Sequence, residues 1–169
     1  MNILITDYIT GNTVRNAGAE TSRQEFEKFL VETKGFEKTD VRVDVPLTVQ
    51  FKGEDYESKI DLIVCCNETP VMAVTCVAGS LGSYEREILA GARLVYDTQI
   101  PLAISTDARD ASVLDTLTGE KVGKGIDAVP SKAEALEMLE KAVPAALEEN
   151  RVEKEMIIYR SFNLEKVNY

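Results

Sequence analysis

Several charged side chains of this sequence are spaced so that they could share one polar site. Lys59 and Asp61 are two residues apart in a strand-like segment, so both point to the same face of that strand. Glu85 and Glu87 open the helix expected after the following strand, and Glu20 opens the first helix. Carboxylate oxygens are the ligands that Mg²⁺ prefers, and a lysine beside them stabilises developing negative charge. These residue types are those of Mg²⁺-dependent chemistry.

The composition excludes several other kinds of catalytic site. The 169 residues include no His, which removes Ser-His-Asp triads, Cys-His pairs and His-ligated zinc. Cys65, Cys66 and Cys76 all lie in apolar runs, and the adjacent Cys65 and Cys66 cannot form an ordinary zinc pair. We therefore expect three buried structural thiols. An odd number of cysteines without a signal peptide is typical of a protein in the reducing cytoplasm.

Length and charge limit the domain organisation and the partners. A chain of this length suits one domain, which we expect over residues 1–169, with a core at about 15–130 and a helical C-terminal extension at about 131–169. The net charge is −10, whereas DNA-binding proteins usually carry a basic surface, so we expect at most weak DNA binding. No segment approaches the roughly 20 apolar residues of a membrane helix, and no secretory signal opens the chain. These features predict a cytoplasmic protein.

The candidate side chains must be positioned by a strand hairpin, a third strand and two helices. Residues 41–51 alternate between apolar and polar side chains, which is typical of a half-buried strand. A turn at 52–55 reverses the chain, and we expect antiparallel pairing on both sides of the return strand. The expected elements are a helix at 20–34, strands at 41–51, 56–66 and 71–78, a helix at 84–96 capped by Ser83, and a strand at 101–105.

The rest of the chain predicts a hairpin and two helices. Residues 111–122 read as a hairpin, and a capping box at Ser131 opens a helix that runs to about Lys141. Residues 145–163 read as a last amphipathic helix. The segments 5–12 and 113–120 share Asp-x-(Ile/Leu)-Thr-Gly, which predicts two similar turns rather than a duplicated unit.

A set of motifs relates these elements to a known family. The motifs are Glu20-x-x-Arg23 in the first helix, Asp61 in the return strand, Ile104-Ser-Thr-Asp107, and the Asp115-x-x-Thr-Gly119 hairpin. With this order of elements, the chain resembles the PD-(D/E)xK nuclease superfamily, and more closely the N-terminal domain of the type I restriction enzyme R subunit, over about residues 15–130. The resemblance implies an α/β fold with a restriction-endonuclease-like core, in which a central mixed β-sheet is flanked by helices.

The resemblance also implies a catalytic site that this sequence retains only in part. In the family, an aspartate in the second core strand and a Glu-x-Lys pattern on the third strand hold Mg²⁺ and orient the attacking water. Asp61 matches the aspartate, whereas Thr75 and Val77 stand where the glutamate and the lysine are expected. A threonine hydroxyl is a weak neutral ligand, and valine neither binds metal nor donates a hydrogen bond. We therefore expect no Mg²⁺-dependent cleavage and no tight metal at Asp61.

Three functions remain open. The first is a catalytically degenerate nuclease-fold domain that serves as a binding or assembly module, without a cofactor, and meets restriction-system subunits or, weakly, DNA. The second is an active Mg²⁺-dependent endonuclease with relocated groups, in which Lys59 replaces the lysine and Asp61, Glu20 and Glu85 hold the metal. The third is a small homo-oligomeric interaction protein that does not bind DNA. Lys59 and Glu85 also have an ordinary explanation as solvated surface charges.

Overall fold

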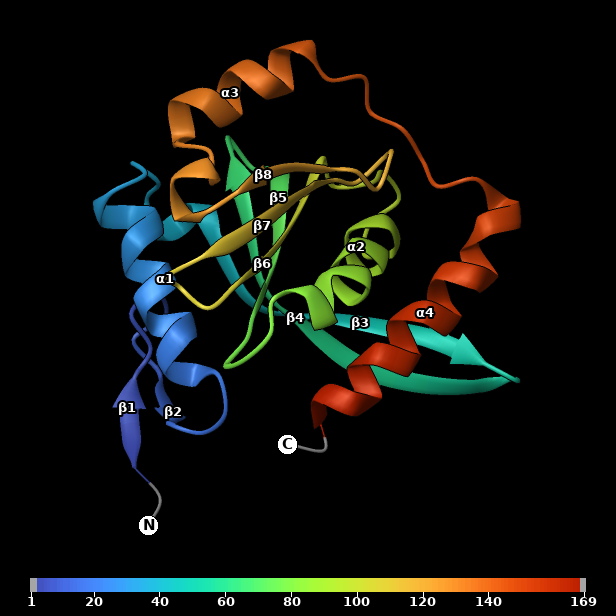
Figure 1. Cartoon of the computed structure of the whole chain (residues 1–169), viewed down its shortest axis with the longest axis horizontal. Helices are drawn as coiled ribbons and strands as arrows, with labels where there is room; N and C mark the ends of the chain where they lie inside the picture. The colour runs from blue at the N-terminus through green and yellow to red at the C-terminus, as the bar shows by residue number, and fades with distance from the viewer. Residues whose placement is uncertain (1–2, 168–169) are drawn as a thin grey trace.

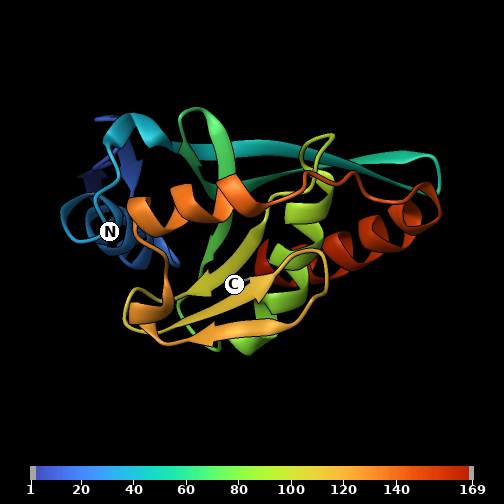
Figure 2. The same cartoon turned by 90° about the horizontal axis from the view of Figure 1, so that it is seen from above.

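The computed structural model describes residues 3–167 as a mixed β-sheet with helices on both faces (Figures 1 and 2). The main sheet has six strands in the order β3-β4-β5-β6-β7-β8. They are β3 (Val41–Phe51), β4 (Glu54–Cys66), β5 (Thr69–Cys76), β6 (Leu102–Thr106), β7 (Ala111–Asp115) and β8 (Lys121–Lys124). Strands β5 and β6 pair in parallel, and the other neighbouring pairs are antiparallel. The α/β fold with a mixed sheet agrees with the sequence prediction and with a restriction-endonuclease-like core.

Helices, short helical turns and a small separate sheet complete the fold. The helices are α1 (Glu20–Glu32), α2 (Glu85–Leu94), α3 (Lys132–Lys141) and α4 (Glu149–Val167), with 3₁₀ turns η1 (Lys38–Asp40), η2 (Gly82–Tyr84) and η3 (Ile126–Ala128). Strands β1 (Leu4–Thr6) and β2 (Thr13–Arg15) form a two-stranded sheet near α1 (Figure 1). Within residues 3–167, no helix is both long and apolar enough to cross a membrane.

Each face of the main sheet has its own apolar core. On one face, Phe26 and Leu30 of α1 and Ala135 of α3 pack with the sheet. On the other face, Ile88 of α2 and Tyr159 of α4 pack with it. The three cysteines are free and buried, which confirms the prediction of structural thiols. The sheet is therefore covered on both sides.

The predicted strand pairing is confirmed, but the first hairpin turn is shorter than predicted. Strand β3 pairs antiparallel with β4, and β4 pairs antiparallel with β5. The register joins Phe51 to Glu54, so the turn contains only Lys52 and Gly53 instead of four residues. Both turn residues have positive φ, at 51° and 80°. Two-residue turns of this kind match the right-handed twist of the strands that they join.

Two helix predictions were wrong in detail and one was confirmed. Ser83 does not cap α2, because it lies inside the turn η2, which leads directly into the helix. Helix α4 begins and ends four residues later than the predicted 145–163, because Ala145 lies in a connection whose carbonyl accepts the Gln99 backbone N–H at 2.9 Å. The capping box at Ser131 is confirmed, with reciprocal hydrogen bonds to Glu134.

The two predicted turns are alike in the structure. In the first, the backbone N–H of Gly11 donates to the Asp7 carbonyl at 2.9 Å, and in the second Gly119 donates to Asp115 at 2.8 Å. The two glycines have φ values of 76° and 78°. The shared Asp and Gly therefore serve the same local turn geometry, as predicted.

Candidate functional site

Asp61 lies beside an irregularity between β3 and β4. Asp44 of β3 has a φ of 54°, and it lies opposite Asp61 without pairing with it. The register of β3 and β4 is the same on both sides of this position. The Asp61 Oδ2 atom accepts the backbone N–H of Cys76 at 2.8 Å, so β5 fixes the carboxylate of β4.

Lys166, near the end of α4, joins the two strand positions at which the family's metal ligands are expected. Its ammonium lies 3.4 Å from Asp61 Oδ2 and 3.2 Å from Glu87 Oε1, and it donates to the Thr75 hydroxyl. The Thr75 hydroxyl also donates to Glu87 Oε1 at 3.4 Å. Strands β4 and β5 and helix α2 thus meet at one ammonium group, which comes from the distant helix α4.

Glu87 is held on its other side by an amide. The Asn163 Nδ2 atom donates to Glu87 Oε2 at 3.2 Å, and the Tyr56 hydroxyl donates to Asn163 Oδ1. Glu87 is only 3% exposed, so both of its oxygens are bonded inside the protein. We refer to Asp61, Thr75, Glu87, Asn163 and Lys166 together as the Lys166 cluster.

The charges of this cluster depend on one another. Burial raises the pKa of Glu87, and the contacts with Lys166 and Asn163 offset part of that rise. Burial alone would lower the pKa of Lys166, but the carboxylates of Asp61 and Glu87 outweigh it and hold the pKa above its usual value. Lys166 is therefore cationic at neutral pH and balances the two acidic groups.

A cavity of about 610 Å³ opens beside the cluster. Its walls come from the segment that leads into α1, from β4, from the loop after β5 and from the end of α4. Asp61 and Lys166 line this cavity, whereas Thr75 and Glu87 do not. Only part of the cluster is thus directly accessible to a molecule that enters the cavity.

The structure brings some of the predicted site residues together and separates others. Glu20 and Lys59 line the same cavity as Asp61, but Glu20 pairs with Arg23 at 2.6 Å. The Lys59 side chain is 61% exposed and its ammonium lies 3.2 Å from the carboxylate of Asp44.

Two further predicted site residues, Glu85 and Val77, differ in whether they line the cavity. Glu85 does not line the cavity, and its carboxylate pairs instead with the Lys121 ammonium at 2.8 Å. Val77 is buried at 2% exposure and forms an apolar part of the cavity wall. Its backbone N–H donates to the Thr106 carbonyl at 2.9 Å.

Sequence reasoning missed Asn163 and Lys166, and it favoured Glu85 over Glu87 as the metal ligand on this helix. Glu87 shares the acidic first turn with Glu85, but its position four residues before Gly91 places it on the buried side of α2. A Cβ on Gly91 would lie 3.3 Å from Ile60 and 3.4 Å from Tyr159, so this side approaches its neighbours closely. Asn163 and Lys166 continue the buried stripe of Tyr159 at helical spacing, and this pattern was the available signal.

Comparisons with known proteins agree with this fold. The sequence model of the type I restriction enzyme R protein N terminus (HSDR_N) matches residues 18–130. Because this is more than half of the chain, the protein belongs to the HSDR_N family. No curated protein sequence matches the chain.

One solved structure is similar. It is the fragment structure of an HsdR subunit of a type I restriction enzyme from Vibrio vulnificus YJ016, with a TM-score of 0.51 and 20% sequence identity over 72% of this chain. The chain covers 25% of the length of that solved chain. A similarity at this level of identity shows the shared fold.

The resemblance implies a Mg²⁺ ion between Asp61 and position 75, and the residues present do not fit one. The Lys166 ammonium already contacts the Asp61 carboxylate and the Thr75 hydroxyl. A divalent cation at the same place would meet a positive charge at contact distance, which is unfavourable. Within residues 3–167, no group of three or more His, Cys, Asp or Glu side chains could hold a metal ion.

Proposed function

We propose that this protein is a catalytically degenerate nuclease-fold domain that serves as a binding or assembly module of a restriction-type system. The single observation that carries the proposal is the position of the Lys166 ammonium, which bonds to Asp61 and Thr75 at once. In the family that this chain resembles, these two strand positions carry the carboxylates that hold the metal ion. Lys166 acts as an internal cation in place of the metal and secures α4 to the sheet.

The chemistry of the neighbouring positions supports the same proposal. Cleavage needs a cation held by carboxylates and a charged group that orients the attacking water. Here the expected glutamate is Thr75 and the expected lysine is Val77, and Val77 is an apolar part of the cavity wall. Losing one well-placed charged group typically reduces a rate by orders of magnitude, and two are absent.

Charge and family support a protein partner more than a nucleic acid. The net charge of −10 opposes the neutralisation of phosphates on which DNA affinity depends. The chain belongs to a family named after the R protein of type I restriction enzymes, and it spans only a quarter of the similar solved chain. We therefore place the function in assembly with restriction-system subunits, with DNA contact weak.

A cleavage assay tests this proposal. Plasmid and single-stranded DNA are incubated with the wild-type protein and Asp61→Ala, first with Mg²⁺ and then with Mn²⁺. The proposal predicts the same background for both proteins under all conditions. Nicking by the wild type that disappears in Asp61→Ala would contradict it.

A second candidate function, an active Mg²⁺-dependent nuclease with relocated groups, is favoured by one specific observation. Glu87 and Lys166 supply the two residue types that the third strand lacks, and both reach the neighbourhood of Asp61. This function requires Lys166 to leave its present contacts. It predicts nicking that is lost in Glu87→Gln and in Lys166→Met but kept in Glu85→Gln, a matched control two residues away on the same helix.

A further inference from the structure

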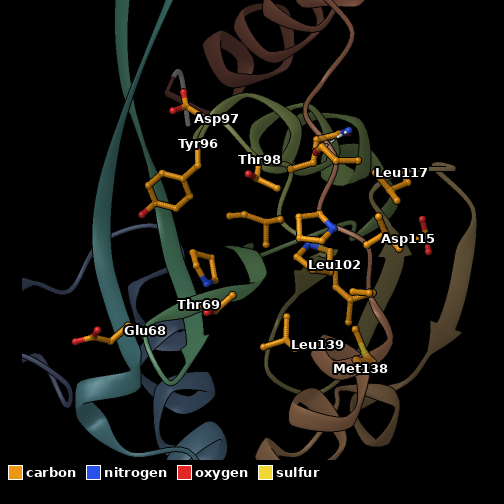
Figure 3. A pocket seen from close by; sticks show the side chains of 18 of the residues that line it. Glu68, Thr69, Tyr96, Asp97, Thr98, Leu102, Asp115, Leu117, Met138 and Leu139 are labelled. Atoms are coloured by element: carbon orange, nitrogen blue, oxygen red, sulfur yellow. Dashed lines mark hydrogen bonds between the residues drawn. The ribbon is translucent and has the colours of Figure 1, made fainter.

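Figure 3 shows a second cavity. It lies at the other end of the parallel strands β5 and β6 from the Lys166 cluster. Its volume is about 860 Å³, which is within the range of binding sites in proteins. The first residues of both strands line it, together with the end of α3 and the connection from α3 to α4. We refer to this cavity as the α3–β6 groove.

The groove gathers apolar side chains, two of which are exposed to solvent. The buried Leu102 and the partly buried Met138 and Leu139 line it together with Leu117 (Figure 3), and Val143 lines it as well. Leu117 is 47% exposed and Val143 is 80% exposed. Exposed apolar side chains that converge on one groove mark an interaction site more often than scattered ones do.

Acidic side chains line the same groove. Glu68, Asp97 and Asp115 are placed around the apolar residues, two on one side and one on the other (Figure 3). Arg42 is the one cation among the lining residues of the described chain. Its guanidinium is already engaged, because it donates to the Tyr96 hydroxyl at 2.8 Å and to the Glu68 carbonyl at 3.3 Å. An incoming partner thus meets an apolar surface with a negative margin.

We propose that the α3–β6 groove binds a basic, apolar segment of a partner protein, with aliphatic side chains in the groove and Lys or Arg side chains against its acidic margin. Charge complementarity selects this occupant over a second copy of the chain, because two copies would each bring a net charge of −10 to the interface. The groove is separate from the Lys166 cluster, so this inference does not depend on whether the Asp61 site is degenerate.

Binding of a designed peptide tests the proposal. The probe is a fluorescent peptide built only from Leu and Lys at helical spacing, and its anisotropy is followed as the full chain is added at physiological salt. We expect saturable binding that Val143→Asp weakens at least about tenfold. Val122→Asp is the matched control, since this valine is 59% exposed on β8 and does not line the groove.

The sign of the substitution separates groove binding from general attraction to an acidic protein. Both aspartate variants add a negative charge, which would strengthen non-specific binding of a basic peptide. Only occupation of the apolar groove predicts weaker binding in Val143→Asp together with unchanged or slightly stronger binding in Val122→Asp. A second peptide with Glu in place of Lys should bind at least about tenfold more weakly than the first.

Several outcomes would overturn the proposal. They are no saturable binding of the Leu/Lys peptide, equal binding by the wild type and Val143→Asp, and equal binding of the Leu/Glu peptide. Sedimentation that shows a dimer dissociated by Val143→Asp would assign the groove to a second copy. Binding of anilinonaphthalene sulfonate that is lost in Val143→Asp but is not displaced by the peptide would assign it to a small apolar ligand.

Discussion

Two partly buried charged clusters flank the same cavity, and they differ in their ratio of cations to carboxylates. The Lys166 cluster surrounds one ammonium with the carboxylates of Asp61 and Glu87. A second group, which we call the Arg23 cluster, consists of Arg23 with Asp7, Glu20, Glu27 and Asp44. The Arg23 guanidinium lies 3.3 Å from Asp7, 2.6 Å from Glu20 and 2.8 Å from Asp44.

The unbalanced member of the Arg23 cluster is Glu27. It is 0% exposed, and neither of its carboxyl oxygens receives a well-formed hydrogen bond from the described residues. Burial, reinforced by the neighbouring Asp7 carboxylate, raises the pKa of Glu27 to about 8. The Lys166 cluster thus sets one cation against two carboxylates, whereas the Arg23 cluster sets Arg23, with Lys59 at its exposed edge, against four acidic groups. The raised pKa keeps Glu27 mostly protonated at neutral pH.

The largest expected effect comes from removing the cation of the balanced cluster. Lys166→Met keeps most of the side-chain volume but leaves Glu87 buried without its counter-charge. Breaking a buried pair from one side costs about 3–5 kcal/mol of unfolding free energy, and we expect a loss near the middle of that range. Urea unfolding at neutral pH measures it, with the exposed Lys154→Met on the same helix as the control. Equal stability of the two variants would show that Lys166 has no structural role.

The next effect concerns the unbalanced cluster and its dependence on pH. Since the pKa of Glu27 rises from its ordinary 4.5 to about 8 on folding, the folded protein keeps a proton that the unfolded chain releases between these values. The contribution of Glu27 to the free energy of unfolding therefore falls as the pH rises from 4.5 to about 8, by at most about 1.4 kcal/mol per pH unit. Above this window the contribution no longer changes with pH.

Glu27→Gln should remove this slope. The variant and the wild type should be equally stable near pH 4.5, and the variant should be more stable by ~3 kcal/mol at pH 8, because an amide carries no charge to desolvate. Urea unfolding of both proteins across this range provides the comparison. Two curves that run parallel would mean that Glu27 does not titrate in this window.

A smaller effect tests the amide that completes the balanced cluster. Asn163→Ala removes the hydrogen bond to Glu87 and leaves the Tyr56 hydroxyl without its acceptor. We expect a loss of roughly 1–2 kcal/mol in the unfolding free energy, as for other buried hydrogen bonds. Combined with Glu87→Gln, the loss should be less than the sum of the two single changes, because the residues share one network. If the two losses of unfolding free energy were strictly additive, Asn163 would not be coupled to Glu87.

The smallest effect is expected at the lysine that the sequence placed nearest to Asp61. Lys59 is exposed, and within residues 3–167 its ion pair is with the partly exposed Asp44. Lys59→Met should change the unfolding free energy by no more than about 0.5 kcal/mol, as is usual for surface charges. The contrast with Lys166→Met under identical conditions is the informative quantity. A loss as large as that of Lys166→Met would reassign the supporting cation to Lys59.

The sequence predicted the strand framework and the position of Asp61, because alternation and turn residues are local signals. The strands β3, β4 and β5 pair as expected, and Asp61 lies close to Thr75 through their shared contact with Lys166. Lys166 itself could not be placed, because it lies 91 residues further along the chain than Thr75 and its location depends on how α4 docks on the sheet. The predicted helix also ended at residue 163, three residues short of it.

The central claim is that the Lys166 ammonium occupies the place of a metal ion between Asp61 and Thr75. Mn²⁺ binding, followed by the loss of the free-ion signal in electron paramagnetic resonance, tests it most directly. Lys166→Met frees Asp61 and Glu87 together, so it should bind Mn²⁺ at least about tenfold more tightly than the wild type. Tight Mn²⁺ binding by the wild-type protein that Asp61→Ala abolishes would contradict the claim.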